Sequence, residues 1–265
     1  MSAKKKKIIV AVIILLVAPC LFFLVQNKRH MKRVRDYAKE EKFALAKHEL
    51  EKVVCLSPKS LDDCKLMMDV YLKNYDLGNV DYIAELCLHK GFKDKTVVFH
   101  RTKTRELRGD FNGALGILGA EISSGSGSGS AASDPDYFLT AAQLLTRMNN
   151  TQGAAAAYLN VYKLAGDSLE IKFKAVGALV ELKAHEQASL LAKNLAGQSF
   201  TQPVPYLLLA RIFMQLNDTA NAKIAYEKGH PLLSSVEEKV RDQIMQNFQD
   251  VLKAFIGKKE VSPKK

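Results

Sequence analysis

The side chains that could do chemistry in this chain are cysteines and histidines, and their spacing argues against a site. Cys87 and His89 are two residues apart, and on a helix such residues point about 200° away from each other. They would therefore not share a metal ion. The six histidines are scattered, and neither a G-x-x-x-x-G-K-[ST] nor an H-E-x-x-H motif occurs. We expect no catalytic residues, no metal and no cofactor, and so no enzyme.

The cysteine count gives no disulfide framework. Cys20 lies in an apolar N-terminal run, which leaves Cys55, Cys64 and Cys87 for the folded part of the chain. Three is an odd number, and no C-x-x-C metal pair occurs. Cys55 and Cys64 flank a predicted helix–helix turn and could approach each other. We prefer the interpretation that the cysteines are buried free thiols, which pack as small apolar side chains.

The net charge of +11 favours acidic partners, anionic lipid or nucleic acid. Much of the excess lies in short Lys/Arg runs at the termini and beside the apolar run. A nucleic-acid binder would need basic residues interleaved with aromatic residues along one face, and that pattern is absent from the sequence. We therefore expect no nucleic-acid partner.

A pattern with a period of about 34 residues organises the stretch 136–231. Its clearest copy places aromatic, aliphatic and small residues at fixed positions: Tyr206, Leu209, Ala210, Phe213, Ala222 and Tyr226. One period earlier, these positions hold Lys172, Ala175, Val176, Leu179, Ala188 and Ala192. Two periods earlier, they hold Phe138, Ala141, Ala142, Leu145, Ala154 and Tyr158. A period of this length with small residues at the helix contacts resembles the tetratricopeptide repeat, a helix–turn–helix unit that stacks into a solenoid.

The resemblance implies an all-α fold, a right-handed solenoid of helical hairpins with three repeats over 32–122 and three over 134–233. Ala46 and Ala114 are separated by twice the period, and we expect the middle repeat between them to have slipped out of register. The stretch 123–133 is rich in Gly, Ser and Ala and predicts a flexible linker. Ala154 follows Ala114 by more than one period, so the linker lengthens that period by six positions.

The N-terminus predicts a membrane anchor. A basic head over 1–7, with Lys4, Lys5, Lys6 and Lys7, precedes an uncharged run over 8–25. As a helix this transmembrane run would be roughly 27 Å long, close to the roughly 30 Å of a bilayer core. A signal cleaved near Cys20 is the alternative, but the apolar residues continue beyond that point, so we expect an uncut anchor.

The orientation of the anchor is open to two interpretations. Basic residues also follow the run, namely Lys28, Arg29, Lys32, Arg33 and Arg35, so the positive-inside rule gives conflicting indications. A short basic head before an apolar run is the usual layout of a signal anchor. We expect an extracytoplasmic, periplasmic solenoid, with a cytoplasmic one as the alternative.

The C-terminus predicts a capping helix over 234–256 and a basic tail over 257–265. Ser234-x-x-Glu237 and Ser235-x-x-Glu238 each match a capping box at a helix start. An apolar stripe follows, made of Val236, Val240, Ile244, Phe248, Val251, Leu252 and Phe255. A solenoid needs such a terminal element to cover its last repeat.

The family resemblance also implies where a partner binds. In tetratricopeptide repeat proteins, the first helix of each repeat lines a concave groove that takes an extended peptide or a helix. By that resemblance Phe99 and Lys103 face the groove in the third repeat, and Arg211 and Met214 in the last. His100 belongs to the same basic stretch as Lys103, for which an exposed basic helix face is the alternative.

We therefore expect a membrane-tethered scaffold that binds a protein or peptide partner in the assembly of an envelope complex. The basic charge favours acidic groups on that partner. The alternative functions are a receptor for protein translocation or import, and a protein that binds an anionic lipid surface.

Overall fold

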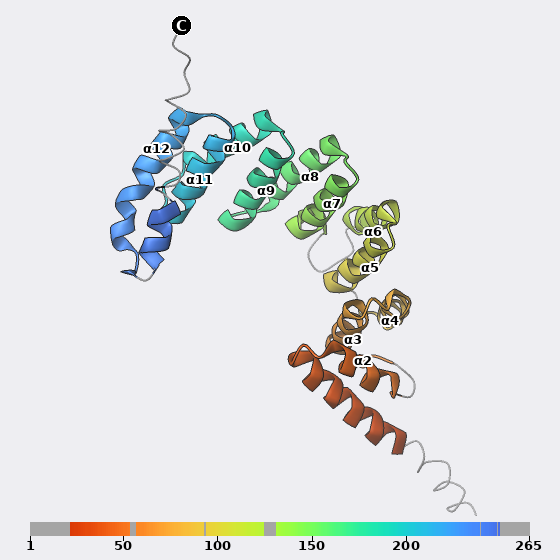
Figure 1. Ribbon diagram of the computed structural model, residues 1–265. Coiled ribbons are helices and arrows are strands. Elements are labelled where there is room, and N and C mark those ends of the chain that lie inside the picture. Colours follow the sequence, from red (N-terminus) through yellow and green to blue (C-terminus); the bar gives the residue numbers. More distant parts are fainter. Residues whose placement is uncertain are drawn as a thin grey trace, which may run out of the picture. The chain divides into compact units, whose positions relative to one another are not determined.

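The computed structural model describes residues 22–53, 57–92, 94–124, 131–238, 240–247 and 249. The regular elements in this part of the chain are all helices (Figure 1). The expected basic head and tail, and the expected anchor as far as residue 21, lie outside the described residues. Within the described ranges, no helix combines the length and the apolar character needed to cross a membrane.

The chain divides into two compact units, Met1–Ser128 and Gly129–Lys265. The first, the N-terminal unit, contains three helical hairpins. Residues 22–39 are helical and precede α2 (Phe43–Glu51); α3 (Leu61–Lys73) pairs with α4 (Leu77–His89), and α5 (Lys95–Leu107) with α6 (Phe111–Ser124). Helix α3 packs against α4, and α5 packs against α6; the first helices α3 and α5 also contact each other.

The C-terminal unit also contains three hairpins. A short 3₁₀ turn, η1 (Ala131–Ser133), precedes α7 (Pro135–Arg147) and α8 (Thr151–Leu164). They are followed by α9 (Leu169–Glu181) with α10 (His185–Ala196), and by α11 (Pro203–Gln215) with α12 (Thr219–Gly229). A 3₁₀ segment, η2 (His230–Ser235), leads to a last helix that begins at residue 238. The boundary between the two units falls within the expected linker.

Each hairpin turns through one residue with a left-handed backbone, at φ values from 55° to 76°: Glu41, Tyr75, Gly109, Asn149, Lys183 and Asn217. The next residue then donates its N–H to a carbonyl five residues earlier, as from Asp76 to Tyr71 (2.9 Å) and from Asp218 to Phe213 (2.8 Å). This is the Schellman arrangement that ends many helices. Successive turns are one period apart, except across the linker, where the interval is longer by the six inserted positions.

Short polar side chains begin four of the second helices. Asp76, Asp110, Asn150 and Asp218 each accept a hydrogen bond from the backbone N–H three residues later. Such N-caps satisfy amide groups that the first helical turn leaves unpaired. The turn therefore combines a left-handed residue with an Asn or Asp cap, which is a local reason for the chain to reverse at these points.

The hairpins pack closely at one position that recurs with the same period. Ala46, Val80 and Ala114 in the N-terminal unit, and Ala154, Ala188 and Ala222 in the other, are all fully buried. The expectation that the second repeat had slipped is wrong, because Val80 takes the place of the small residue and Tyr75 keeps the turn in register. The repeat was not recognisable in the sequence because valine is larger than the alanine that occupies this position in the other repeats.

The core of the N-terminal unit contains a disulfide bond that we did not expect. Cys64 in α3 and Cys87 in α4 are both fully buried and are bonded to each other, with their Cα atoms 6.2 Å apart. The interpretation of these two as free thiols is therefore wrong, and Cys64 is not available to pair with Cys55. Cys55 itself lies outside the described residues.

The core of the C-terminal unit is built from alanine, leucine and aromatic side chains. Phe213 is fully buried, Tyr206 is nearly so, and Tyr226 packs at the edge. Ile244 and Met245 of the last helix pack against this core, as a terminal element should. Residues 251–256 of the expected capping helix lie outside the described residues.

The capping boxes at the start of that last helix are not formed. The hydroxyl groups of Ser234 and Ser235 instead donate to the carbonyl groups of Pro231 (3.0 Å) and Leu232 (2.7 Å). The reason is that Pro231 continues the chain as the 3₁₀ segment η2 through Ser235, so the helix begins later than the serines.

Candidate functional site

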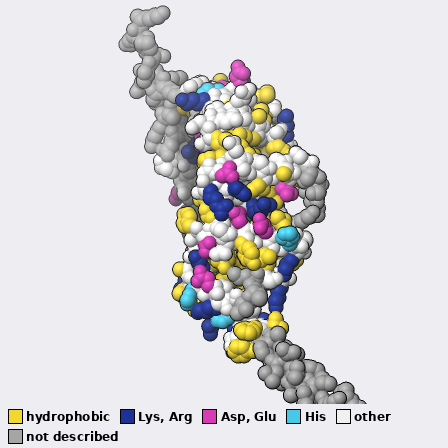
Figure 2. All heavy atoms as spheres, turned by 90° about the vertical axis from the view of Figure 1, so that its right-hand side faces the viewer, with side chains coloured by type: hydrophobic (Ala, Val, Ile, Leu, Met, Phe, Trp, Pro, Cys, Tyr) yellow, Lys and Arg dark blue, Asp and Glu magenta, His cyan; other side chains and the backbone are white. Residues whose placement is uncertain are grey.

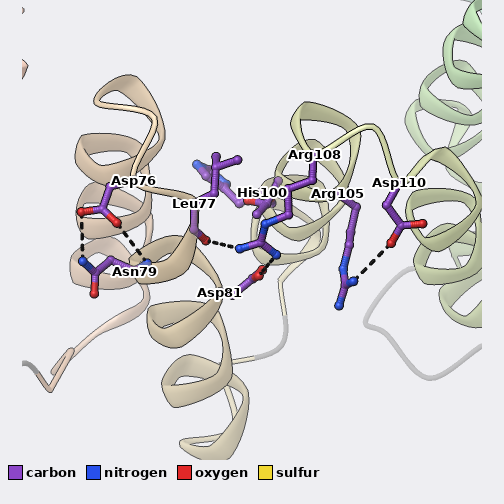
Figure 3. Close-up of polar contacts among 9 residues, drawn as sticks. Asp76, Leu77, Asn79, Asp81, His100, Arg105, Arg108 and Asp110 are labelled. Atoms are coloured by element: carbon purple, nitrogen blue, oxygen red, sulfur yellow. Dashed lines mark hydrogen bonds and ion pairs between the residues drawn. The ribbon is translucent and has the colours of Figure 1, made fainter.

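The basic stretch on α5 is largely paired with acidic groups. Arg108 contacts the carboxylate of Asp81 on α4 and donates to the carbonyl of Leu77, 3.0 Å away (Figure 3). Arg105 donates to Asp110 at 3.2 Å, at the turn into α6. The contacts of Arg108 join the second and third hairpins, and the carboxylates of Asp81 and Asp110 neutralise two cations of the expected basic helix face.

Other cations on this helix follow the same trend. The ammonium group of Lys103 lies 3.0 Å from the carboxylate of Glu106, one turn away. On the face drawn in Figure 2, Lys and Arg side chains lie next to Asp and Glu side chains, with hydrophobic side chains between them. That face therefore mixes both signs of charge, which weakens the case for a partner recognised by charge alone.

His100 is buried and joins two first helices. Its Nε2 lies 2.7 Å from an Asp69 carboxylate oxygen on α3, and its Nδ1 lies 2.7 Å from the Thr96 carbonyl oxygen. Both partners only accept hydrogen bonds, so the imidazolium form, with two N–H groups, satisfies both. Burial alone would lower the pKa of His100, but the bonds to Asp69 and Thr96 outweigh it and raise the pKa. We therefore leave His100 out of the proposed partner contacts.

The other four expected contact residues lie on first helices, two in each unit. Phe99 and Lys103 are half-buried and stand one turn apart on α5. Arg211 on α11 is exposed, and Met214 is half-buried against the core of the C-terminal unit. The structure thus brings the residues together as two separate pairs, each on one helix face.

The basic residues that follow the expected anchor fall into two groups. Arg33 lies 3.5 Å from Glu49 on α2, and Arg35 lies 2.6 Å from Asp63 on α3. In contrast, the exposed side chains of Lys28, Arg29 and Lys32 make no ion pair with the described part of the chain. Lys4 to Lys7 lie outside the described residues.

Glu49 is a buried acid that the sequence analysis missed. Its carboxylate lies 2.6 Å from Lys52 and 2.8 Å from His30, and Arg33 is the third partner. The hydrogen bond from Lys52, and then that from His30, lower the pKa of Glu49 to about 2. A sequence signal did exist, because Glu49 stands among the apolar positions Ala46, Leu50 and Val53. An acid in an apolar stripe indicates a buried ion pair.

The described residues present candidate binding surfaces on the outer faces of their helices. Among the described residues, no three His, Cys, Asp or Glu side chains stand close enough together to hold a metal ion. The buried side-chain nitrogen and oxygen atoms described here all have hydrogen-bond partners. What remains for a partner is the set of side chains on the outer faces of the helices.

The chain matches no protein-family model and no curated protein sequence. Among solved structures, it is similar to Pseudomonas aeruginosa pilF (14% identity, TM-score 0.46), covering 83% of this chain and 96% of that one. It is also similar to a tetratricopeptide repeat protein from Parabacteroides merdae (10% identity, TM-score 0.45, 84% and 99% covered). A third is MamA protein (11% identity, TM-score 0.45, 66% and 92% covered).

The family resemblance rests on the register of the chain itself. Turns and fully buried helix-contact residues recur once per period within each unit, and each period contains one helical hairpin. The fold is tetratricopeptide-like. In this tetratricopeptide-like chain, the first helices are 22–39, α3 and α5 in one unit and α7, α9 and α11 in the other.

Proposed function

We propose that this chain is a membrane-tethered scaffold that binds a protein partner through the first helices of its hairpins. Tetratricopeptide-like folds bind protein partners generally, and they do so without catalytic residues. The observation that carries the proposal is the pair Arg211 and Met214. A solvent-exposed cation and an adaptable apolar side chain stand one turn apart on α11.

The chemistry of that pair suggests the kind of segment it fits. Arg211 makes no ion pair with a described residue. The other residues of α11 are almost all apolar, so the helix itself offers no acidic partner. A carboxylate on the partner would complete a charge-assisted hydrogen bond there. Met214 would contact an apolar side chain one turn away on the partner. Phe99 and Lys103 also place an apolar side chain and a cation one turn apart on α5, but there the cation already pairs with Glu106.

Two observations support the proposed membrane attachment and location. Residues 22–25, the last four of the apolar run over 8–25, are exposed. The Cys64–Cys87 disulfide supports an extracytoplasmic solenoid, because disulfides persist in oxidising compartments and are rare in the cytosol. An envelope complex is the setting that we propose for the partner.

Site-specific photo-crosslinking of the full chain in its own membranes tests the proposed face. We expect a photoreactive residue at Arg211 to give a discrete adduct with one partner protein. The matched control is Lys223, which is also exposed but lies on the second helix α12. Adducts of equal yield from both positions, or from Lys223 alone, would contradict the proposal.

A further inference from the structure

The first four described residues of the helix over 22–39 are apolar and point in every direction. Phe22, Phe23, Leu24 and Val25 are exposed by 60%, 47%, 48% and 50%. Successive helical residues are about 100° apart, so four of them cover nearly the whole circumference. A partner helix would bury only one stripe, whereas a helix that is apolar all round is suited to a protein core or a bilayer.

Three cations that make no ion pair with a described residue follow on the same helix. At about 1.5 Å of rise per residue, the backbones of Lys28, Arg29 and Lys32 lie roughly 5, 6 and 10 Å beyond Val25. The polar headgroup layer of a bilayer is about 5–8 Å thick on each side. Long Lys and Arg side chains reach back from such positions to the lipid phosphates while their charged ends stay solvated.

Two buried acids pair with neighbouring cations of this helix, whereas Lys28, Arg29 and Lys32 make no ion pair with a described residue. Glu49 on α2 pairs with His30 and Arg33, and Asp63 on α3 pairs with Arg35. These ion pairs connect the later part of the helix to α2 and α3. The helix is continuous over 22–39. The end that carries the apolar residues and the free cations is therefore part of the folded first hairpin.

We propose that Lys28, Arg29 and Lys32 form a headgroup collar that binds the phosphate groups of anionic phospholipids. Residues 22–25 then lie in the adjoining apolar layer. The collar holds the first hairpin directly at the membrane surface. This inference rests on the proposed membrane attachment and adds to it a lipid class and the residues that recognise it.

Lipid selectivity of the full chain tests the collar. The chain is reconstituted in phosphatidylcholine vesicles that contain trace spin-labelled phosphatidylglycerol or spin-labelled phosphatidylcholine, and the label at the protein surface is quantified. We expect a preference for phosphatidylglycerol at low salt. Each cation near an anionic surface raises the affinity for it about fivefold. The preference for phosphatidylglycerol should therefore be at least about fivefold weaker in the variant K28Q/R29Q/K32Q.

Two further variants serve as controls. Lys39→Gln removes a cation that is also exposed on the same helix but whose backbone lies roughly 21 Å beyond Val25, and this variant should keep the preference. The charge-conserving variant K28R/K32R should keep it too. An unchanged preference in the triple variant, or an equal loss with Lys39→Gln, would overturn the collar while the chain still floats with the vesicles. Failure of the wild-type chain to float with them would instead overturn the membrane attachment, and the collar with it.

Discussion

The two units share one backbone plan and are stabilised by different chemistry. Among the described residues, the buried polar and charged side chains all lie in the N-terminal unit: Glu49, Asp63, His100, Thr102 and Thr104. That unit also contains the disulfide and ion pairs that join different helices. In the C-terminal unit the ion pairs Lys174–Glu170 and Lys223–Glu227 each lie within one helix at the surface.

The difference shows that the repeat period specifies the hairpin backbone but not the interactions that stabilise it. A buried charge that loses its partner is left uncompensated, so the N-terminal unit should respond to pH and to reductant. A close-packed apolar core responds to volume instead, and the C-terminal unit should be sensitive mainly to the size of its side chains. Each of the following changes should therefore act on one unit and spare the other.

Removal of the disulfide should have the largest effect. The two cysteines are 23 residues apart, and opening a loop of that length lowers the free energy of unfolding by about 3 kcal/mol. We expect C64A/C87A to speed hydrogen exchange in α2 to α5 of the full chain and to leave α8 to α12 unchanged. Equal loss in both units would show that they are not stabilised independently.

Glu49→Gln should come next, at about 1.5–3 kcal/mol, because hydrogen bonds to a charged group contribute that much. The pKa of Glu49 is lowered from 4.5 to about 2, so its contribution is present above pH 4.5 and disappears as the pH falls towards 2. Denaturant melts between pH 5 and about 2.5 should show that the variant has lost this acid dependence.

The matched control for that change is Glu170→Gln, which removes an exposed carboxylate paired with Lys174 on α9. It should leave the denaturation midpoint unchanged. A destabilisation as large as that of Glu49→Gln would mean that burial does not distinguish the two acids.

Overpacking should damage the C-terminal unit alone. Ala222 is fully buried at the contact between α11 and α12, so Ala222→Leu should cost about 1–3 kcal/mol. Its exposed neighbour provides the control, since Lys223→Ala should change stability by less than about 0.5 kcal/mol. Hydrogen exchange resolved by region measures both. Equal tolerance of the two substitutions would remove the register on which the repeat assignment rests.

The smallest effect should come from His100. Its pKa is raised above the ordinary 6.5, so its stabilisation is complete below that pH and is lost as the pH rises through the raised value. We expect about 1 kcal/mol, because the side chain of its partner Asp69 is 54% exposed and solvent screens the pair. Thermal melts followed by circular dichroism at pH 6 and pH 8.5 should differ for the wild type and agree for His100→Gln.

The fold could be predicted because its determinants are local and periodic. A small residue at the helix contact and an Asn or Asp after the turn recur at fixed intervals, as at Ala222 and Asp218. Where a bulkier residue replaces the small one, as at Val80, the repeat is no longer recognisable in the sequence, although the backbone keeps the same register. The prediction of the start of the last helix was wrong because Pro231 lies in the 3₁₀ segment η2, which includes Ser234 and Ser235.

The site could be predicted less well because its contacts connect distant residues. His100 looks like one more surface cation, and only the packing of α5 against α3 buries it beside Asp69, 31 residues away. Cys64 and Cys87 meet because the hairpin between them closes in one register. Spacing along the chain specifies which face of a helix a residue occupies, but not what covers that face.

The left-handed turn residues have a consequence for engineering. Five of the six are not glycine, and that backbone conformation costs an L-residue roughly 1–2 kcal/mol, least for Asn. Glycine in place of Tyr75 or Lys183 would relieve that strain at the surface, without altering a buried side chain. Because a solenoid unit contacts only its neighbours, each such change acts locally. The thermal stability of each hairpin can thus be raised separately by a substitution at its own turn.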